Sequence, residues 1–219
     1  MHNMYKFNSL DVVNEQDLKI VETNFANCFD EKTDQFIWTA FKQDDESAYV
    51  YIYQKYFAGL ITYGSQFTKD DQLLEDCIQD LFIDLKKNKS NLTDKNSSIK
   101  LYLFKSLKRR IIEYRRKANR FMFEHVEEEK NFEIVLSIET LLIEKQVKDE
   151  QLIQLRKAME KLTGRQREVL YYLFYEELTY QEIQELMGFD HVRSVRNIFY
   201  KAVTVLKTSF KILILFRLA

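Results

Sequence analysis

The sequence predicts an all-α protein with two helical domains joined by an acidic linker. The 219 residues include no proline and only four glycines, and these two residue types are the commonest breakers of regular structure. Strand-like alternation of apolar and polar residues is rare, whereas apolar residues often recur at the three- and four-residue spacing of a helix. With 46% apolar residues, the chain can bury one sizeable core or two small ones.

The composition along the chain divides it into four segments. Residues 1–34 form a polar, weakly patterned leader of unknown role. Residues 35–120 carry a dense helical pattern and form the first expected domain. Residues 121–149 include the acidic run "EHVEEEKNFE" and are expected to link this domain to a compact second domain at 150–219.

Three long helical stretches stand out in the first domain. The stretch "DDESAYVYIYQKYFAGLITYGSQF" begins with acids and a serine that suit a helix N-terminus. Residues 70–87 form the clearest predicted helix, with one apolar stripe and an acidic opposite side. Its two lysines lie at the C-terminal end, where positive charge interacts favourably with the helix dipole. After a polar loop at 88–98, residues 99–120 predict another amphipathic helix, with Tyr114 on its core side.

The net charge of −1 conceals separate blocks of charge. Residues 99–120 contain nine lysines or arginines and one acid, whereas residues 122–150 contain nine acids and three lysines. Such blocks indicate surfaces with different partners, and solvated helix faces that cluster by chance are the simpler alternative.

Catalysis and metal binding are not expected. Cys28 and Cys77 are far apart, and the three histidines have no partner at metal-ligand spacing. The sequence has no glycine-rich phosphate loop, zinc-protease motif or serine-hydrolase motif. We therefore expect no enzyme activity, metal or cofactor. Isolated thiols, a start without signal-peptide features and an apolar tail too short to span a bilayer favour the cytoplasm.

The second domain contains a predicted helix-turn-helix, "LTYQEIQELMGFDHVRSVRNIFYKAV" (178–203). Thr179 suits the N-cap of a short first helix, and Gly188 can adopt the positive φ that turns the chain. Asp190 or His191 then opens a second helix. If the second helix enters a DNA major groove, arginine can pair with guanine and asparagine with adenine. The simpler alternative is an ordinary αα-hairpin with a solvated basic face. The outward residues are expected to be Arg193, Ser194, Arg196, Asn197, Tyr200 and Lys201.

These residues resemble a known family. The stretch "LTGRQREVLYYLFYEELTYQEIQELMGF" and the basic helix after it resemble region 4 of sigma-70-type initiation factors of the extracytoplasmic-function group. Upstream, "DDESAYVYIYQKYF", "LLEDCIQDLFIDLKKN" and "IKLYLFKSLKRRIIEYRRK" are similar to region 2 of the same group. The two motifs occur in the right order and together cover roughly residues 40–117 and 150–208.

The resemblance implies a bacterial factor that binds RNA polymerase core and directs it to promoters. The acidic helix 70–87 would dock on the clamp helices of the largest polymerase subunit, through Asp76, Gln79, Asp80 and Ile83. An anti-sigma factor is a further implied partner, because this group is commonly held inactive by one.

The resemblance also assigns DNA contacts. The −10 element would be captured by a loop that holds a flipped base and by the basic helix, with Tyr102 or Phe104 as the strand-facing aromatic. The loop residues are Asn91, Thr93, Asp94, Lys95 and Asn96, and the helix residues are Tyr102, Lys105, Lys108, Arg109, Arg115 and Arg116. The recognition helix would read the −35 element through His191, Arg193, Ser194, Arg196, Asn197, Tyr200 and Lys201.

Two other functions fit parts of the sequence. A stand-alone helix-turn-helix regulator would use the first domain as a sensor or dimerisation domain, and a helical adaptor would bind only proteins. A net charge of −1 argues for a bridging subunit, because free-standing DNA binders gain affinity by neutralising phosphates.

Overall fold

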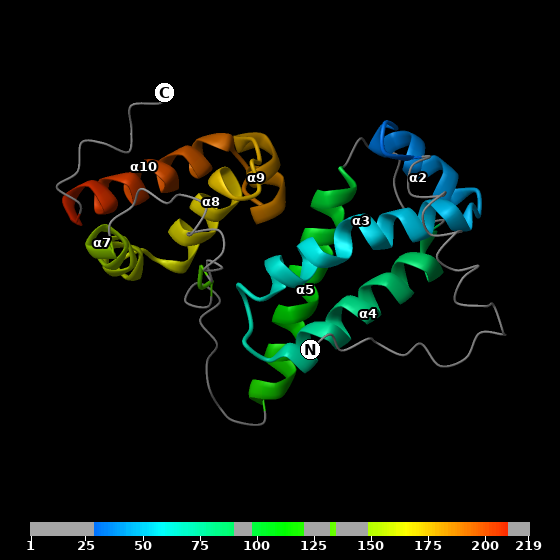
Figure 1. The fold of residues 1–219 in the computed structure, drawn as a ribbon, viewed down its shortest axis with the longest axis horizontal. Coiled ribbons are helices and arrows are strands. Elements are labelled where there is room, and N and C mark those ends of the chain that lie inside the picture. Colours follow the sequence, from blue (N-terminus) through cyan, green and yellow to red (C-terminus); the bar gives the residue numbers. More distant parts are fainter. Residues whose placement is uncertain (1–28, 90–97, 121–131, 135–148, 210–219) are drawn as a thin grey trace.

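The computed structural model describes residues 29–89, 98–120, 132–134 and 149–209. Every regular element in these residues is a helix, and the helices form two domains, as the sequence predicts (Figure 1). The first domain contains α2 (Asp34–Lys42), α3 (Glu46–Gly64), α4 (Asp71–Lys87) and α5 (Ile99–Arg120). The second contains α7 (Asp149–Glu160), α8 (Gly164–Phe174), α9 (Tyr180–Met187) and α10 (Val192–Ser209).

Side-chain caps set where several helices begin. Asp70 accepts a hydrogen bond from the Leu73 amide at 3.0 Å, so α4 starts one residue after its cap. Thr163 and Thr179 form capping boxes with Gln166 and Glu182 at the starts of α8 and α9. Each such cap contributes about 1 kcal/mol and satisfies amides that lack a partner within the helix.

The core of the first domain lies between α3, α4 and α5. The predicted apolar stripe of α4 is buried, and the matching stripe of α5 includes Leu103, Leu107 and Ile111. Gly64 lies where α3 approaches α4 and α5, and a Cβ at this position would collide with the Leu74 side chain. The buried α4 side chains are Leu74, Cys77, Ile78, Leu81, Phe82 and Leu85.

Tyr114 departs from the predicted pattern of α5. Helical spacing places it on the core side, but its side chain is exposed and its hydroxyl donates a 2.6 Å hydrogen bond to Asp80 of α4. The hydroxyl explains the departure, because a buried tyrosine needs a polar partner and Asp80 offers one at the surface.

The two domains share a continuous apolar core. Tyr63 of α3 stacks on Phe104 of α5 with ring centroids 4.1 Å apart, and its ring also lies 6.0 Å from that of Tyr172 in α8. Phe132, in the segment between the domains, is buried and packs against Phe67 and Tyr172. Aromatic side chains from both domains and from the segment between them therefore meet in one cluster.

Phe29 lies within the predicted leader and is also buried. Its ring packs 5.4 Å from that of Tyr51 in α3, so the core of the first domain includes a residue upstream of α2. Among the helices that the structure describes, none combines the length and apolar character needed to cross a membrane.

Candidate nucleic-acid interface

The helix-turn-helix forms at the predicted position. Gly188 ends α9 with φ 68° and ψ 35°, the left-handed conformation that glycine adopts without a steric penalty. The Gln184 side-chain amide donates to the backbone carbonyls of Phe189 and Asp190, at 3.0 and 3.2 Å, and holds the turn. His191 precedes α10, and its backbone carbonyl accepts a hydrogen bond from the Ser194 amide at 3.0 Å.

Buried side chains fix the orientation of α10. Val195 and Ala202 are fully buried, and α10 packs against both α8 and α9. Ile183 and Leu186 form the buried face of α9. The same face of α10 therefore always points inward, and the opposite face is presented to solvent.

The predicted recognition residues lie on that outer face. The side chains of Arg193, Asn197 and Lys201 are exposed, and Tyr200 keeps 63% of its surface accessible. Arg196 is exposed as well and lies over the Tyr180 ring, 5.5 Å from its centroid. His191 is exposed and Ser194 is half-buried. This arrangement permits groove binding, and the DNA contacts themselves stay predictions.

The predicted −10 residues on α5 fall into two groups. Lys105, Arg109 and Arg116 are exposed. Arg115 is half-buried and donates to the backbone carbonyl of Phe67 at 2.7 Å. Lys108 is also half-buried and forms an ion pair with a glutamate of the second domain.

The structure distinguishes the two aromatic candidates on α5. Phe104 is buried under Tyr63 and cannot stack on a base. Tyr102 is only half-buried, and its ring packs edge-on against Trp38 with centroids 5.5 Å apart. Tyr102 is therefore the accessible aromatic of the pair. The predicted base-pocket residues Asn91, Thr93, Asp94, Lys95 and Asn96 lie outside the described residues.

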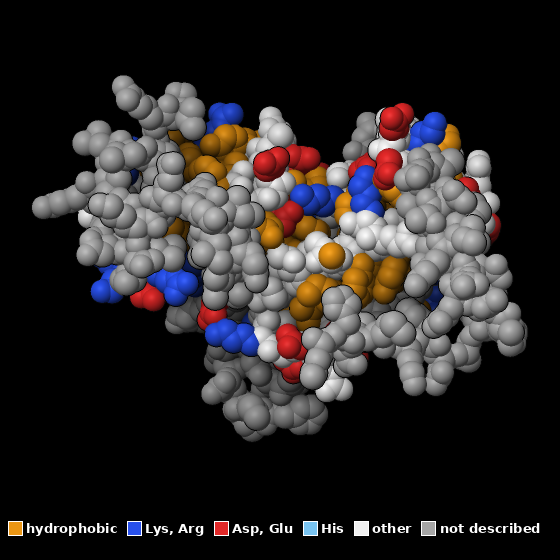
Figure 2. All heavy atoms as spheres, viewed as in Figure 1, with side chains coloured by type: hydrophobic (Ala, Val, Ile, Leu, Met, Phe, Trp, Pro, Cys, Tyr) orange, Lys and Arg blue, Asp and Glu red, His pale blue; other side chains and the backbone are white. Residues whose placement is uncertain are grey.

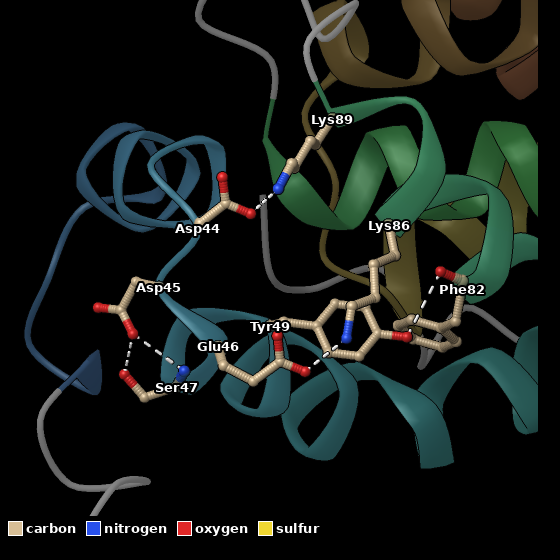
Figure 3. Close-up of polar contacts among 8 residues, drawn as sticks. All are labelled: Asp44, Asp45, Glu46, Ser47, Tyr49, Phe82, Lys86 and Lys89. Atoms are coloured by element: carbon tan, nitrogen blue, oxygen red, sulfur yellow. Dashed lines mark hydrogen bonds and ion pairs between the residues drawn. The ribbon is translucent and has the colours of Figure 1, made fainter.

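The end of α4, which leads into that loop, is tied to the start of α3 (Figure 3). Lys86 pairs with Glu46 at 2.6 Å, and its ammonium lies 5.0 Å from the centroid of the Tyr49 ring. Lys89 pairs with Asp44 in the turn before α3. Burial, together with the charge of Glu46, raises the pKa of Tyr49. These contacts fix the point from which the chain continues into the predicted base pocket.

The predicted polymerase-binding residues share one face of α4. Asp76 and Gln79 are exposed, and Ile83 keeps 47% of its surface accessible although it is apolar. Asp80 is half-buried and accepts the Tyr114 hydrogen bond, which raises the pKa of the Tyr114 hydroxyl. An apolar residue surrounded by acids suits a protein interface. Its polymerase role remains a prediction.

A buried polar chain joins the two domains. Tyr172 donates a 2.7 Å hydrogen bond to Glu168 within α8, and the hydroxyls of Tyr172 and Tyr63 lie 2.8 Å apart. Glu168 pairs with Lys108 of α5. Burial and the nearby Glu168 carboxylate raise the pKa of both tyrosines well above its usual value, so both hydroxyls stay protonated. Figure 2 shows basic and acidic side chains together near the middle of the molecule, where the domains meet.

Sequence reasoning did not single out Glu168 or Phe132. A local signal exists for Glu168, since it lies four residues before the buried Tyr172 on the apolar face of α8. An acid on such a face needs a buried partner. The sequence around Phe132 is acidic, and we find no comparable local signal for its burial.

Two family models match the sequence. The model described as Sigma-70 region 2 matches residues 52–121, and the model described as Sigma-70, region 4 matches residues 152–204. Together the matches span more than half of the chain, and they fall on the first and second domains of the structure. No curated protein sequence matches the chain significantly.

Solved structures with a similar fold include two proteins bound to partners. CnrH, in complex with the cytosolic domain of CnrY, has a TM-score of 0.53 and 14% identity over 80% of this chain and 95% of CnrH. The sigma factor RpoE of Bartonella quintana, in complex with the anti-sigma factor NepR, has a TM-score of 0.50 and 17% identity over 73% of this chain and 94% of RpoE. At these identities the likeness establishes a shared fold.

Proposed function

Because the chain belongs to the sigma-70 family, we propose that it is an extracytoplasmic-function sigma factor that binds RNA polymerase core and starts transcription at selected promoters. The observation that carries this proposal is the presence of both regions in one chain, each with an exposed basic helix face. The region 2 match argues against the alternative of a regulator with a sensor or dimerisation domain at residues 35–120.

In this proposal the second domain reads the −35 element. The exposed face of α10 enters the major groove, where Arg193 and Arg196 can each make two hydrogen bonds to a guanine. Asn197 suits adenine, and Lys201 and Tyr200 suit the flanking phosphates. The glutamates of α9 remain away from the groove, since α9 is the first helix of the motif.

The first domain captures the opened −10 element. Lys105, Arg109 and Arg116 attract the strand backbone, and Tyr102 offers a face or edge to a base. The loop at 88–98 would hold the flipped base through its polar side chains. The tie between the end of α4 and the start of α3 supports a fixed entry into this loop.

Polymerase binding supplies the affinity that the isolated chain lacks. Around Ile83, α4 presents an acidic face with an apolar centre, which suits the clamp helices of the largest polymerase subunit. Once core is bound, both DNA contacts become intramolecular, so neither needs to be strong alone. Nucleotide addition is left to the polymerase, and the factor acts in the cytoplasm without a cofactor of its own.

An anti-sigma factor is the expected regulator. Two proteins with a similar fold were solved with protein partners, the cytosolic domain of CnrY and the anti-sigma factor NepR. By analogy, a protein partner would hold this chain inactive by covering its polymerase-binding or DNA-binding faces.

Run-off transcription tests the proposed function. Purified chain, polymerase core and genomic DNA are combined, and transcript starts are mapped. We expect discrete start sites that require both the chain and core. A set of starts identical to that of core alone, under conditions in which another sigma factor works, would contradict the proposal. Footprinting without core distinguishes the rival regulator, which would protect its operator by itself.

A further inference from the structure

Tyr180 is the first residue of α9, and the helix cap holds it in place. The Thr179 hydroxyl accepts a hydrogen bond from the Glu182 amide at 3.3 Å, and the Glu182 carboxylate accepts one from the Thr179 amide at 2.7 Å. This capping box fixes the backbone that carries the Tyr180 side chain. The side chain itself is half-buried, so part of its surface faces solvent.

A second ring orients the Tyr180 side chain. Phe199 of α10 meets the Tyr180 ring at an interplanar angle of 68°, with the ring centroids 6.2 Å apart. Such edge-to-face contacts are favoured by the charge distribution of aromatic rings. Phe199 is half-buried and lies in turn beside Phe174, the last residue of α8, with centroids 6.4 Å apart. The orientation of the Tyr180 ring is therefore set by packing between α9 and α10.

Arg196 lies over the ring that is oriented in this way. Its guanidinium carbon is 5.5 Å from the Tyr180 ring centroid, within the range of a cation–π contact. The guanidinium forms no hydrogen bond or ion pair with any other residue that the structure describes. A stacked arginine offers its flat face to the ring, so its N–H donors stay available at the edge. Tyr180 thus restrains Arg196 without using the groups that would read a guanine.

Arg193, one turn earlier on α10, provides a comparison. It is exposed like Arg196, but it lies over no aromatic ring of the described part of the chain. A side chain without such a support loses more conformational freedom when it binds. It can also turn towards a phosphate, a contact that carries no sequence information. The two arginines therefore differ in how well their orientation is prepared for a base.

We propose that Tyr180 is a positioning residue for −35 recognition, which holds the Arg196 guanidinium in the orientation that reads a guanine. The inference rests on the proposed function for the identity of the DNA face. It gives α9, the helix that lies outside the groove, a role in base selection. The base preference at Arg196 then depends on a residue that itself touches no base.

The variant Tyr180→Leu removes the ring face and keeps an apolar side chain against Phe199. A mixture of the chain and polymerase core selects duplexes from a pool with a randomised segment, with core alone as the blank. Competition titrations then measure the affinity for each base pair at each selected position. Arg196→Ala and Arg193→Ala identify the base pairs that these two arginines read.

We expect Tyr180→Leu to reduce discrimination at the Arg196 base pair about threefold, because an exposed cation–π contact is weak. Discrimination at the Arg193 base pair should not change, since no ring supports that arginine. Tyr180→Phe is the matched control, because it keeps the ring and removes only the hydroxyl, and it should retain the discrimination of wild type at the Arg196 base pair.

Two outcomes of these titrations would overturn the proposal. The first is a loss of affinity in Tyr180→Leu that is equal for all sequences, which would show that Tyr180 only supports the fold or contacts a phosphate. The second is a loss of discrimination that Tyr180→Leu still causes in the Arg196→Ala background, because the effect would then not pass through the arginine.

A measurement without DNA keeps the test decisive if Tyr180→Leu no longer binds DNA. The ring current of Tyr180 shifts the NMR signal of a proton above the ring, so the Nε–H signal of Arg196 should be shifted in the free full-length chain and in Tyr180→Phe. It should return to the ordinary position of an arginine in Tyr180→Leu, whereas the Arg193 signal should not move. An unshifted Arg196 signal in wild type would overturn the positioning role.

Run-off transcription separates this inference from the proposed function. If wild type and Tyr180→Leu both start transcription with core but discriminate equally at the Arg196 base pair, the sigma function stands and the positioning role fails. If base preference at that position depends on Tyr180, yet neither protein starts transcription, the positioning role stands and the sigma function fails.

Discussion

The two basic helices, α5 and α10, differ in what their charges contact. On α10, Arg193 and Lys201 are exposed and form no ion pair among the described residues. On α5, Lys100 and Lys108 pair with carboxylates of the second domain, and Arg110 pairs with Asp84 of α4 at 2.8 Å. The same residue types therefore serve as free surface charge on one helix and as structural contacts on the other.

This difference determines which charges can contribute to DNA affinity and which also hold the protein's own helices together. A charge that is free in the isolated protein can contact DNA without first breaking a bond. A charge that is already paired must exchange its partner, so its gain in DNA affinity is reduced by the contact it loses. We therefore expect substitutions of the exposed charges of α10 to affect DNA binding alone, whereas substitutions of several charges of α5 also affect stability.

The largest effect is expected from the double substitution Arg193→Ala with Arg196→Ala. Each arginine that pairs with a base contributes about 1–3 kcal/mol, so the binding free energy of the core-bound factor for its promoter should weaken by about 2–6 kcal/mol. An electrophoretic mobility shift assay with polymerase core and promoter DNA measures this loss of affinity. Lys157→Ala, an exposed cation on α7, serves as the control. Equal loss in the control would show that general charge, and not the α10 face, carries the binding.

Gly188→Ala should disturb the presentation of α10. A side chain at φ 68° costs about 1–2 kcal/mol, so the midpoint of thermal unfolding should fall. Gly59→Ala is the matched control, because Gly59 is helical and a Cβ there meets no atom within 4 Å. That control should instead gain about 0.5–1 kcal/mol, since alanine suits a helix interior better. Thermal unfolding followed by circular dichroism measures the stability of both variants. An unchanged unfolding midpoint for Gly188→Ala would contradict the requirement for a left-handed residue at this turn.

Arg110→Met and Arg193→Met compare the two helices directly. Removing Arg110 leaves Asp84 without its partner and should lower the free energy of unfolding by about 1 kcal/mol, because the pair is only partly buried. Removing Arg193 should change it by less than about 0.5 kcal/mol, since the side chain is exposed. Urea denaturation of both variants provides the measurement, and equal losses would remove the distinction between the helices.

The smallest effect is expected for Lys105→Ala. Lys105 is exposed on α5, so it should behave like a charge of α10. Loss of one phosphate contact should weaken single-strand binding by the core-bound factor about twofold to threefold and flatten its salt dependence slightly. Anisotropy titrations at several salt concentrations measure this, with the thermal midpoint expected to stay unchanged. A clear loss of stability would place Lys105 among the structural charges.

Local signals predicted much of the fold. The stripe of α4, the Thr179 cap of α9 and the left-handed Gly188 follow from residues within one or two helical turns. The outer face of α10 follows from the spacing of its buried side chains in the same way. These features depend on short-range chemistry, which the sequence displays directly.

Contacts between distant segments were not predictable in this way. Lys108 and Glu168 lie 60 residues apart, and nothing in the sequence around either residue indicates that the other is its partner. Phe132 is an aromatic residue in an acidic stretch, so composition predicts a linker and not a core position. Helix α2 was not singled out as a separate helix, and the predicted leader included its cap Thr33 and its first residue Asp34, which accepts a hydrogen bond from the first amide of α5.

The packing of Trp38 against Tyr102 gives the protein an intrinsic optical reporter. Trp38 is the single tryptophan of the sequence, and its ring lies 5.5 Å from the aromatic side chain that we expect to meet the −10 strand. A base that stacks near Tyr102 would change the surroundings of the indole and hence its emission. Strand capture could then be followed in real time with unlabelled protein.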